Sequence, residues 1–159
     1  MSFQSQVYLK QAPAVAGDFA SNNPRAALLA GEGALVAGVD GVTVGRFAWA
    51  SNGVVSNVGS DKPQGFIHRE NQAFITSWLS ERSNLIPKGL PVTIHVAGDF
   101  WAQTLTNATV GQKVYASFTT GEIKTDAPGA TVTGYIETDW KVASVASANE
   151  LIKITTWGV

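Results

Sequence analysis

The part of the chain that most constrains its fold is residues 12–50, APAVAGDFASNNPRAALLAGEGALVAGVDGVTVGRFAWA. This segment carries only five charged side chains and is dominated by Ala, Gly and Val. It is too apolar for a solvated linker, and its glycines and prolines interrupt any continuous core helix. We therefore expect it to be buried through tight turns and close backbone contacts, within its own domain or against a neighbouring subunit.

The composition indicates a folded chain with permanent interfaces. The 159 residues suffice for one domain, which buries roughly two-thirds of its unfolded surface. Charged residues make up only 14% of the chain, below the roughly 25% of an average soluble domain. A surface with so few charges is expected to bind other subunits, and a monomer with a Ser, Thr and Asn surface is the alternative. We expect one domain over residues 1–159, with residues 1–40 as a candidate extended N-terminal arm and residues 41–159 as a β-rich body.

Short alternating runs separated by glycine or proline predict an all-β fold. Strands are expected over residues 2–10, 41–50, 54–58, 91–97, 112–118, 129–138, 140–145 and 151–157. Asn52-Gly53 between β-branched runs predicts a hairpin, and a slip in the alternation near Gly45 predicts a bulge. The separators recur roughly every ten residues, as in sandwiches and barrels. The expected fold is a jelly roll or a related β-barrel or sandwich, with an irregular Gly/Ala-rich N-terminal segment and at most one short helix.

One segment, residues 70–83 (ENQAFITSWLSERS), departs from the strand pattern. Phe74 and Trp78 are four positions apart, as are Ile75 and Leu79, which predicts a short amphipathic helix. A strand is the alternative, because Phe, Ile, Thr and Trp all favour β structure.

The sequence contains no set of residues typical of catalysis. It has no cysteine and two histidines, His68 and His95, which lie far apart and have no cluster of acidic residues around them. No G-x-S-x-G elbow is present, and the glycines of residues 31–38 lack the third glycine of a dinucleotide-binding loop. We expect both histidines to bond to backbone groups or to lie on a solvated face. The chain is therefore predicted not to be an enzyme, with no catalytic residue, no metal site and no cofactor.

The charge and hydropathy patterns exclude two classes of partner. The 11 basic residues are scattered among 12 acidic ones, without the basic stripe that nucleic-acid binding requires. No run of about 18 apolar residues is present for a membrane-spanning helix. The tryptophans are expected to be core or interface anchors, and a surface platform that stacks on sugars is the alternative.

One pentapeptide, Val-Ala-Gly-Asp-Phe, occurs twice, at residues 15–19 and 96–100. The flanking residues of the two copies do not match. We interpret the recurrence as coincidence or as two uses of one turn type, and not as an internal repeat.

Several short blocks, in order over nearly the whole chain, carry a family resemblance. They are AGDFAS (16–21), NPR (23–25), VGRFAW (44–49), GFIHR (65–69), IPKGLPVT (86–93), GDFW (98–101) and ITTWG (154–158). Together they resemble the structural cement (head-decoration) proteins of tailed bacteriophages. The resemblance implies a non-enzymatic, β-rich virion protein, made in the bacterial host cytoplasm, that binds the major capsid protein on the outer capsid surface and cements neighbouring capsomers. A carbohydrate-binding or host-surface adhesion module displayed on the virion is the alternative.

Interface residues are expected within the apolar N-terminal part of the chain. The best candidates are Phe19, Pro24, Arg25, Arg46 and Phe47. Phe and Arg are frequent interface anchors, and an arginine in a charge-poor segment is expected to have a dedicated partner. We also expect a homo-oligomer, for which a dimer and a trimer are both compatible with the sequence.

Overall fold

The computed structural model describes residues 14–70 and 84–159, and every regular element among them is a β-strand. One sheet has six strands, in the order β1 (Ala26–Ala27), β8 (Ile94–Ala97), β6 (Gly65–Ile67), β4 (Phe47–Ser51), β5 (Val54–Ser56) and β2 (Val36–Ala37). The second has five, in the order β11 (Ile123–Asp126), β10 (Lys113–Ser117), β12 (Tyr135–Val142), β13 (Leu151–Thr155) and β9 (Asp99–Gln103). A small third sheet pairs β3 (Val42–Thr43) with β7 (Leu85–Ile86). The described residues include no helix of sufficient length and hydrophobicity to span a membrane.

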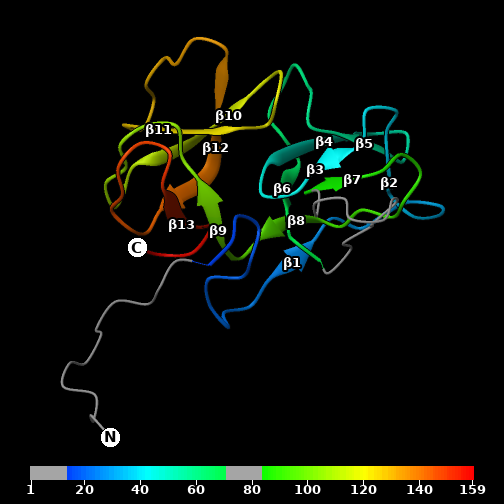
Figure 1. Ribbon diagram of the computed structural model, residues 1–159, viewed down its shortest axis with the longest axis horizontal. Coiled ribbons are helices and arrows are strands. Elements are labelled where there is room, and N and C mark those ends of the chain that lie inside the picture. The colour runs from blue at the N-terminus through cyan, green and yellow to red at the C-terminus, as the bar shows by residue number, and fades with distance from the viewer. Residues whose placement is uncertain (1–13, 71–83) are drawn as a thin grey trace, which may run out of the picture.

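The two larger sheets are joined by a core of aromatic side chains. In Figure 1 the five-stranded sheet lies on the left and the six-stranded sheet on the right. Phe47 and Phe66 from the six-stranded sheet meet Phe100 and Trp140 from the five-stranded sheet, with ring centroids 5.2 to 6.1 Å apart. All four rings are at most 3% exposed. Burial of each ring contributes about 2 kcal/mol to stability, so this core is the main link between the sheets.

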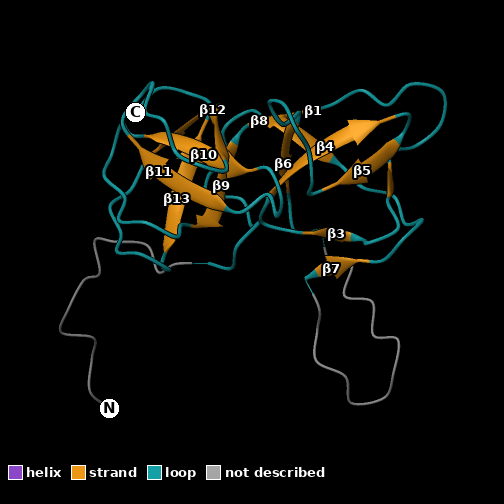
Figure 2. Cartoon of the chain, turned by 90° about the horizontal axis from the view of Figure 1, so that it is seen from above, coloured by secondary structure: helices purple, strands orange, loops and turns teal. Residues whose placement is uncertain are grey.

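The opposite face of the six-stranded sheet is buried as well. Figure 2 shows β3 and β7 as a separate layer below β4 and β5. Val42 and Ile86 from this layer are buried in a second core together with Ile67 of β6. Its neighbour Phe66 faces the aromatic core, because successive side chains of a strand point to opposite faces. The six-stranded sheet is therefore the middle layer of the molecule.

The prediction of an all-β fold is confirmed. The sheets are open, and none formed by the described residues closes into a barrel, so the arrangement matches the β-sandwich among the predicted alternatives. The hairpin prediction is also confirmed: β4 and β5 pair Ser51 with Val54, and both turn residues have positive φ, 52° at Asn52 and 79° at Gly53. Positive φ at both central positions is the requirement of the tight hairpin turn that Asn-Gly favours.

Several strand boundaries differ from the prediction. The expected strand over residues 41–50 is two strands in different sheets, because the chain turns at Gly45, where φ is 75°. The two strands expected over residues 129–138 and 140–145 are largely one, β12. Strand β6 was not predicted, because its three residues are all buried and therefore show no alternation. The expected strand at residues 2–10 and the segment 71–83 lie outside the described residues.

The N-terminal arm over residues 1–40 stays a prediction. Residues 1–13 of this segment lie outside the described part of the chain. Within the rest, β1 pairs with β8 and β2 pairs in parallel with β5, so both strands belong to the six-stranded sheet.

A glycine in the turn between β10 and β11 connects the two larger sheets at their backbones. The N–H of Phe47 donates to the carbonyl oxygen of Gly121 over 2.9 Å. A Cβ at Gly121 would overlap the carbonyl oxygen of Phe47, and its φ is 67°, a value that disfavours any side chain. Beside this contact, Arg46 forms an ion pair with Glu122 at 2.8 Å.

Replacement of this glycine is expected to weaken the contact between the sheets. Gly121→Ala adds both backbone strain and a clash with Phe47, so we expect a loss of roughly 3 kcal/mol or more in the free energy of unfolding, measured by urea denaturation. Gly129→Ala is the matched control, because its φ is 76° but no atom lies within 4 Å of the added Cβ. The control is expected to cost about 1 kcal/mol from backbone strain alone. Equal losses in the two variants would contradict this interpretation.

Candidate functional site

A loop before β1 lies along the outer edge of β9. The backbone of residues 17–20 bonds to β9 through three hydrogen bonds, from Gly17 N to Trp101 O at 2.7 Å, from Trp101 N to Asp18 O at 2.8 Å and from Ala20 N to Asp99 O at 2.9 Å. Phe19 and Phe100 face each other in an antiparallel bridge. The two copies of the Val-Ala-Gly-Asp-Phe pentapeptide meet only at their phenylalanines, because in this antiparallel register residues 17 and 18 lie beside Trp101, outside the second copy. The glycine of each copy has positive φ. The loop therefore acts as an irregular additional strand of the five-stranded sheet.

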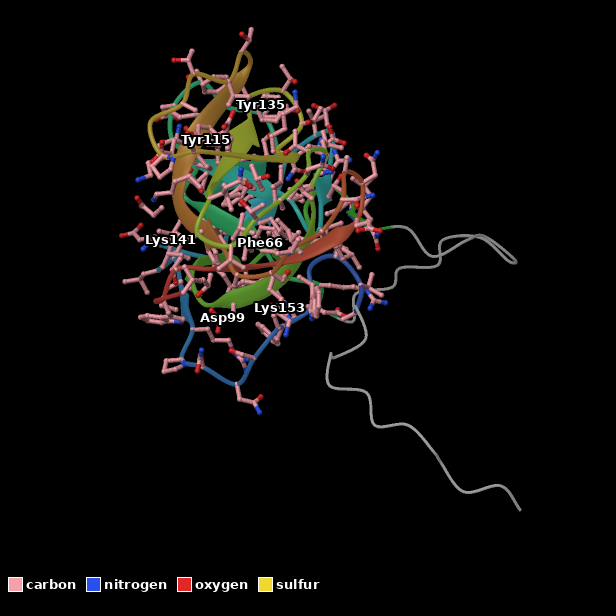
Figure 3. The ribbon with its side chains drawn as sticks, turned by 90° about the vertical axis from the view of Figure 1, so that its left-hand side faces the viewer. Phe66, Asp99, Tyr115, Tyr135, Lys141 and Lys153 are labelled. Atoms are coloured by element: carbon pink, nitrogen blue, oxygen red, sulfur yellow. The ribbon has the colours of Figure 1, made fainter. Side chains whose placement is uncertain are left out.

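Asp99, the first residue of β9, fastens the tip of this loop. Its Oδ2 accepts hydrogen bonds from Ser21 Oγ at 2.5 Å and from Asn23 Nδ2 at 2.6 Å. Its Oδ1 accepts one from Thr155 of the neighbouring strand β13. Figure 3 shows Asp99 and Lys153 at the end of the molecule beside this loop. Burial raises the pKa of Asp99, but the three donated hydrogen bonds outweigh it, so the pKa lies below its usual range.

Phe19 lies between a histidine and an arginine. The ring of His68 stacks on it with centroids 3.7 Å apart and planes at 20°, and the guanidinium carbon of Arg25 lies 3.8 Å from the Phe19 centroid. Two groups at these distances must occupy opposite faces of the ring. The Nδ1 of His68 is 2.7 Å from the carbonyl oxygen of Gly17, and it must be the donor because a carbonyl oxygen only accepts. The cation–π contact with Phe19 therefore holds the Arg25 guanidinium against the loop.

His95 is buried next to this stack. Its ring centroid is 5.6 Å from that of His68 and 5.1 Å from that of Phe100, and the residue is 7% exposed. Neither ring nitrogen has a hydrogen-bond partner among the described residues. Burial, together with the nearby His68, lowers the pKa of His95 to about 4. Burial also lowers the pKa of His68, against the bond to Gly17. His95 is thus a neutral ring at neutral pH.

The outer side of the loop forms a surface that we call the loop face. It consists of the exposed residues Asn22, Asn23, Pro24 and Arg25 together with Trp157. The indole of Trp157 is fixed by its Nε1, which donates to the carbonyl oxygen of Pro24 over 3.1 Å, although the residue stays 41% exposed. No carboxylate pairs with Arg25 in residues 14–70 and 84–159. The loop face thus presents an apolar ring and a cation in fixed positions.

The structure separates the five residues expected at an interface. Three of them, Phe19, Pro24 and Arg25, come together in the loop. Arg46 is elsewhere, and its partner belongs to the same chain: it binds Glu122 and donates to the carbonyl oxygen of Thr120 over 3.2 Å. Phe47 is fully buried in the aromatic core, because it is the inward-facing residue at the start of β4.

The residues that position the loop were not found from the sequence. Asp99 and His68 are distant in sequence from the side chains they hold, so no local spacing reveals them. The one local signal was the repeated pentapeptide, whose two copies meet at Phe19 and Phe100. Both histidines were expected to bond to backbone groups or to lie on a solvated face. His68 does bond to Gly17, but for His95 the prediction is wrong, because its ring is buried and has no hydrogen-bond partner among the described residues. However, the described residues contain no group of three or more His, Cys, Asp or Glu side chains that could hold a metal ion.

The anchoring of the loop by Asp99 is testable through its pH dependence. Asp99→Asn keeps the shape but removes the charged acceptor, and we expect a loss of about 2 kcal/mol in the free energy of unfolding at pH 7. Because the folded-state pKa lies below the unfolded value of 3.8, this contribution is complete above pH 3.8 and disappears as the pH falls through the folded-state pKa. Urea denaturation from pH 7 to pH 2.5 measures the difference between wild type and variant. A difference that stays constant over this range contradicts the assignment.

The buried His95 predicts a loss of stability in a separate pH range. The unfolded chain binds a proton at His95 near pH 6.5, but the folded chain does so only at about pH 4. Stability therefore falls as the pH drops from 6.5 to 4, by up to roughly 3 kcal/mol. His95→Leu is expected to remove most of this slope, leaving the smaller contribution of His68. Parallel stability curves for the two proteins in this range would show that His95 is not the titrating group.

Comparison with known proteins places the chain among phage capsid proteins. It matches the family described as XM1 gp53 minor capsid protein over residues 3–156. Among solved structures it is similar to a chain of the capsid of Myoviridae phage XM1, with a TM-score of 0.60 and 18% identity over 98% of each chain. At this identity the structural match shows a shared fold. No curated protein matches the chain.

The family match covers nearly the whole chain and includes both larger sheets and the loop at residues 17–25. It confirms the prediction of a bacteriophage capsid-associated structural protein located in the virion. The chain belongs to the XM1 gp53 minor capsid protein family.

Proposed function

We propose that this capsid protein binds the outer surface of the phage head and cements neighbouring capsomers, without catalysing a reaction. A protein that binds the assembled lattice, and not its separated subunits, stabilises the lattice by its binding free energy. Contacts with two capsomers at once also raise the effective concentration of each contact, so modest interfaces become strong. The major capsid protein is the partner in this proposal.

The observation that carries the proposal is the fixed geometry of the loop face. Asp99 holds the loop tip by hydrogen bonds, Phe19 holds the guanidinium of Arg25, and Pro24 holds the indole of Trp157. A surface whose side chains are already ordered loses less conformational entropy when it binds. Tryptophan and arginine are also the residues most enriched among those that dominate binding energy. The loop face is therefore the capsid-contact surface that we propose.

Carbohydrate binding has less support from the structure. Stacking on sugars requires exposed aromatic rings. Among the described tryptophans, Trp49, Trp101 and Trp140 are at most 6% exposed, whereas Trp157 is the exposed one. A single partly exposed indole does not make a platform, so we do not propose this function.

A homo-oligomer is part of the proposal. The low charge content of 14% favours contacts between subunits, and symmetric positions of the shell provide sites for either a dimer or a trimer. Light scattering of the purified protein measures its mass in solution, and a monomer at all concentrations would contradict this point.

The proposal is tested on shells of the major capsid protein assembled without this chain. Addition of the purified chain is expected to raise the thermal melting temperature of the shells. Electron microscopy is expected to show added density on the outer surface, between capsomers. Density on the inner surface, or an unchanged melting temperature at full occupancy, would overturn the proposal.

The role of the loop face predicts which substitutions weaken binding. Trp157→Ala removes the exposed ring, and we expect the affinity for empty shells to fall at least about tenfold in cosedimentation. Val39→Ser is the control, because Val39 is 75% exposed but follows β2, at the opposite end of the six-stranded sheet from β1. The control is expected to bind like the wild type. If Val39→Ser loses affinity for the shells and Trp157→Ala binds like the wild type, the capsid contact lies at the β2 end of the six-stranded sheet.

A further inference from the structure

Three of the four outer edges of the larger sheets are covered by the chain itself. Residues 17–20 cover β9, as described above. Residues 104–106 cover β11, where Leu105 N donates to Ile123 O over 2.9 Å. Residues 89–92 cover β2, where Ala37 N donates to Leu90 O over 2.9 Å. Covered edges are protected from pairing with other chains.

The fourth edge, that of β1, is free in the described structure. Figure 1 shows β1 at the lower margin of the six-stranded sheet. On its inner side Leu28 N donates to Ile94 O over 2.8 Å. Because N–H groups alternate along a strand, those of Ala27 and Leu29 point away from the sheet, and no other strand of residues 14–70 and 84–159 pairs with β1 on that side. The side chain of Leu29 is 93% exposed and Ala27 is exposed as well.

A fixed cation stands at the beginning of this free edge. Arg25 directly precedes β1, and its guanidinium is held over the Phe19 ring at 3.8 Å. The aliphatic part of the Arg25 side chain also packs closely against Gly98. A Cβ added to Gly98 would lie only 3.2 Å from the Cβ of Arg25. A guanidinium presents a planar fork of donors that matches a carboxylate. No carboxylate of the described chain fills that role.

We infer that an extended segment of the major capsid protein adds as a strand to the free edge of β1, and that Arg25 binds a carboxylate of that segment. This inference rests on the proposed function and names the partner's chemistry at the loop face. Strand addition obtains affinity from backbone hydrogen bonds and specificity from side-chain contacts. Here β1 is short, with two residues, so the contact with Arg25 determines which segment binds.

Charge complementarity argues against a second copy of this chain on the same edge. Residues 22–31 (NNPRAALLAG) contain no acidic residue. Symmetric pairing of two β1 strands over residues 22–31 would bring no carboxylate to either Arg25 from the paired residues themselves. A partner strand that carries its own acidic residue would form hydrogen bonds with the backbone groups at the edge of β1 and an ion pair with Arg25.

Two pairs of variants test the two parts of the inference. Leu29→Pro removes the outward N–H, and Leu29→Ala shortens the side chain but keeps the N–H. We expect Leu29→Pro to lower the affinity for empty shells at least about tenfold, and Leu29→Ala less than about threefold.

The second pair of variants tests the contact of Arg25 with a carboxylate. Arg25→Gln removes the charge and Arg25→Lys keeps it without the planar fork. Arg25→Gln is expected to lose at least about tenfold and Arg25→Lys an intermediate amount. Unchanged thermal unfolding of each free variant confirms that it is folded.

Hydrogen–deuterium exchange measures occupancy of the edge directly. The amides of Ala27 and Leu29 are expected to exchange rapidly in the free wild type and slowly on the shells. If wild type binds the shells but these amides stay unprotected and Arg25→Gln binds normally, the inference is overturned while the proposed function stands. Protection that rises with protein concentration without shells shows a second copy on the edge and overturns it as well. If wild type does not bind shells at all, both fail.

Discussion

A continuous series of packed aromatic rings connects the interior of this protein to its loop face. It begins at Trp140 between the two larger sheets, continues through Phe100, and reaches Phe19, whose outer face carries the guanidinium of Arg25. Each contact is a packing interaction within a well-filled core, so movement of one ring displaces the next. The position of a surface arginine in this capsid protein thus depends on the same core that holds its sheets together.

The same series explains why the N-terminal loop is ordered despite its composition. The loop covers the edge of β9, and Asp99 at the start of that strand holds its tip, so apolar residues that cannot form a helix still bury their backbone groups. This arrangement includes a buried histidine, His95, whose ring nitrogens have no partner in the described structure. A neutral ring is tolerated there because its pKa is lowered to about 4, so no buried charge forms at neutral pH.

Sequence patterns predicted the elements whose causes are local. The Asn52-Gly53 turn was found because its two residues must adopt positive φ, and β13 because it alternates between a buried and a more exposed face. Strand β6 was missed because both of its faces are buried, which removes the alternation. The expected interface residues also proved to be of two kinds. Arg25 is exposed and has no carboxylate partner in the described chain, whereas Phe47 is buried in the core. Residue type alone does not distinguish an exposed interface residue from a buried core residue.

By itself the sequence determined the all-β class, the hairpin and, through its ordered family blocks, a place in the phage capsid. These follow from turn chemistry, from alternation and from matches spread over the whole chain, none of which requires knowledge of distant contacts. The tertiary structure alone decided that Asp99 holds the loop tip, that Phe19 faces Phe100, and that β1 keeps a free edge. Each of these depends on residues far apart in the chain, and only the packing of the sheets brings them together.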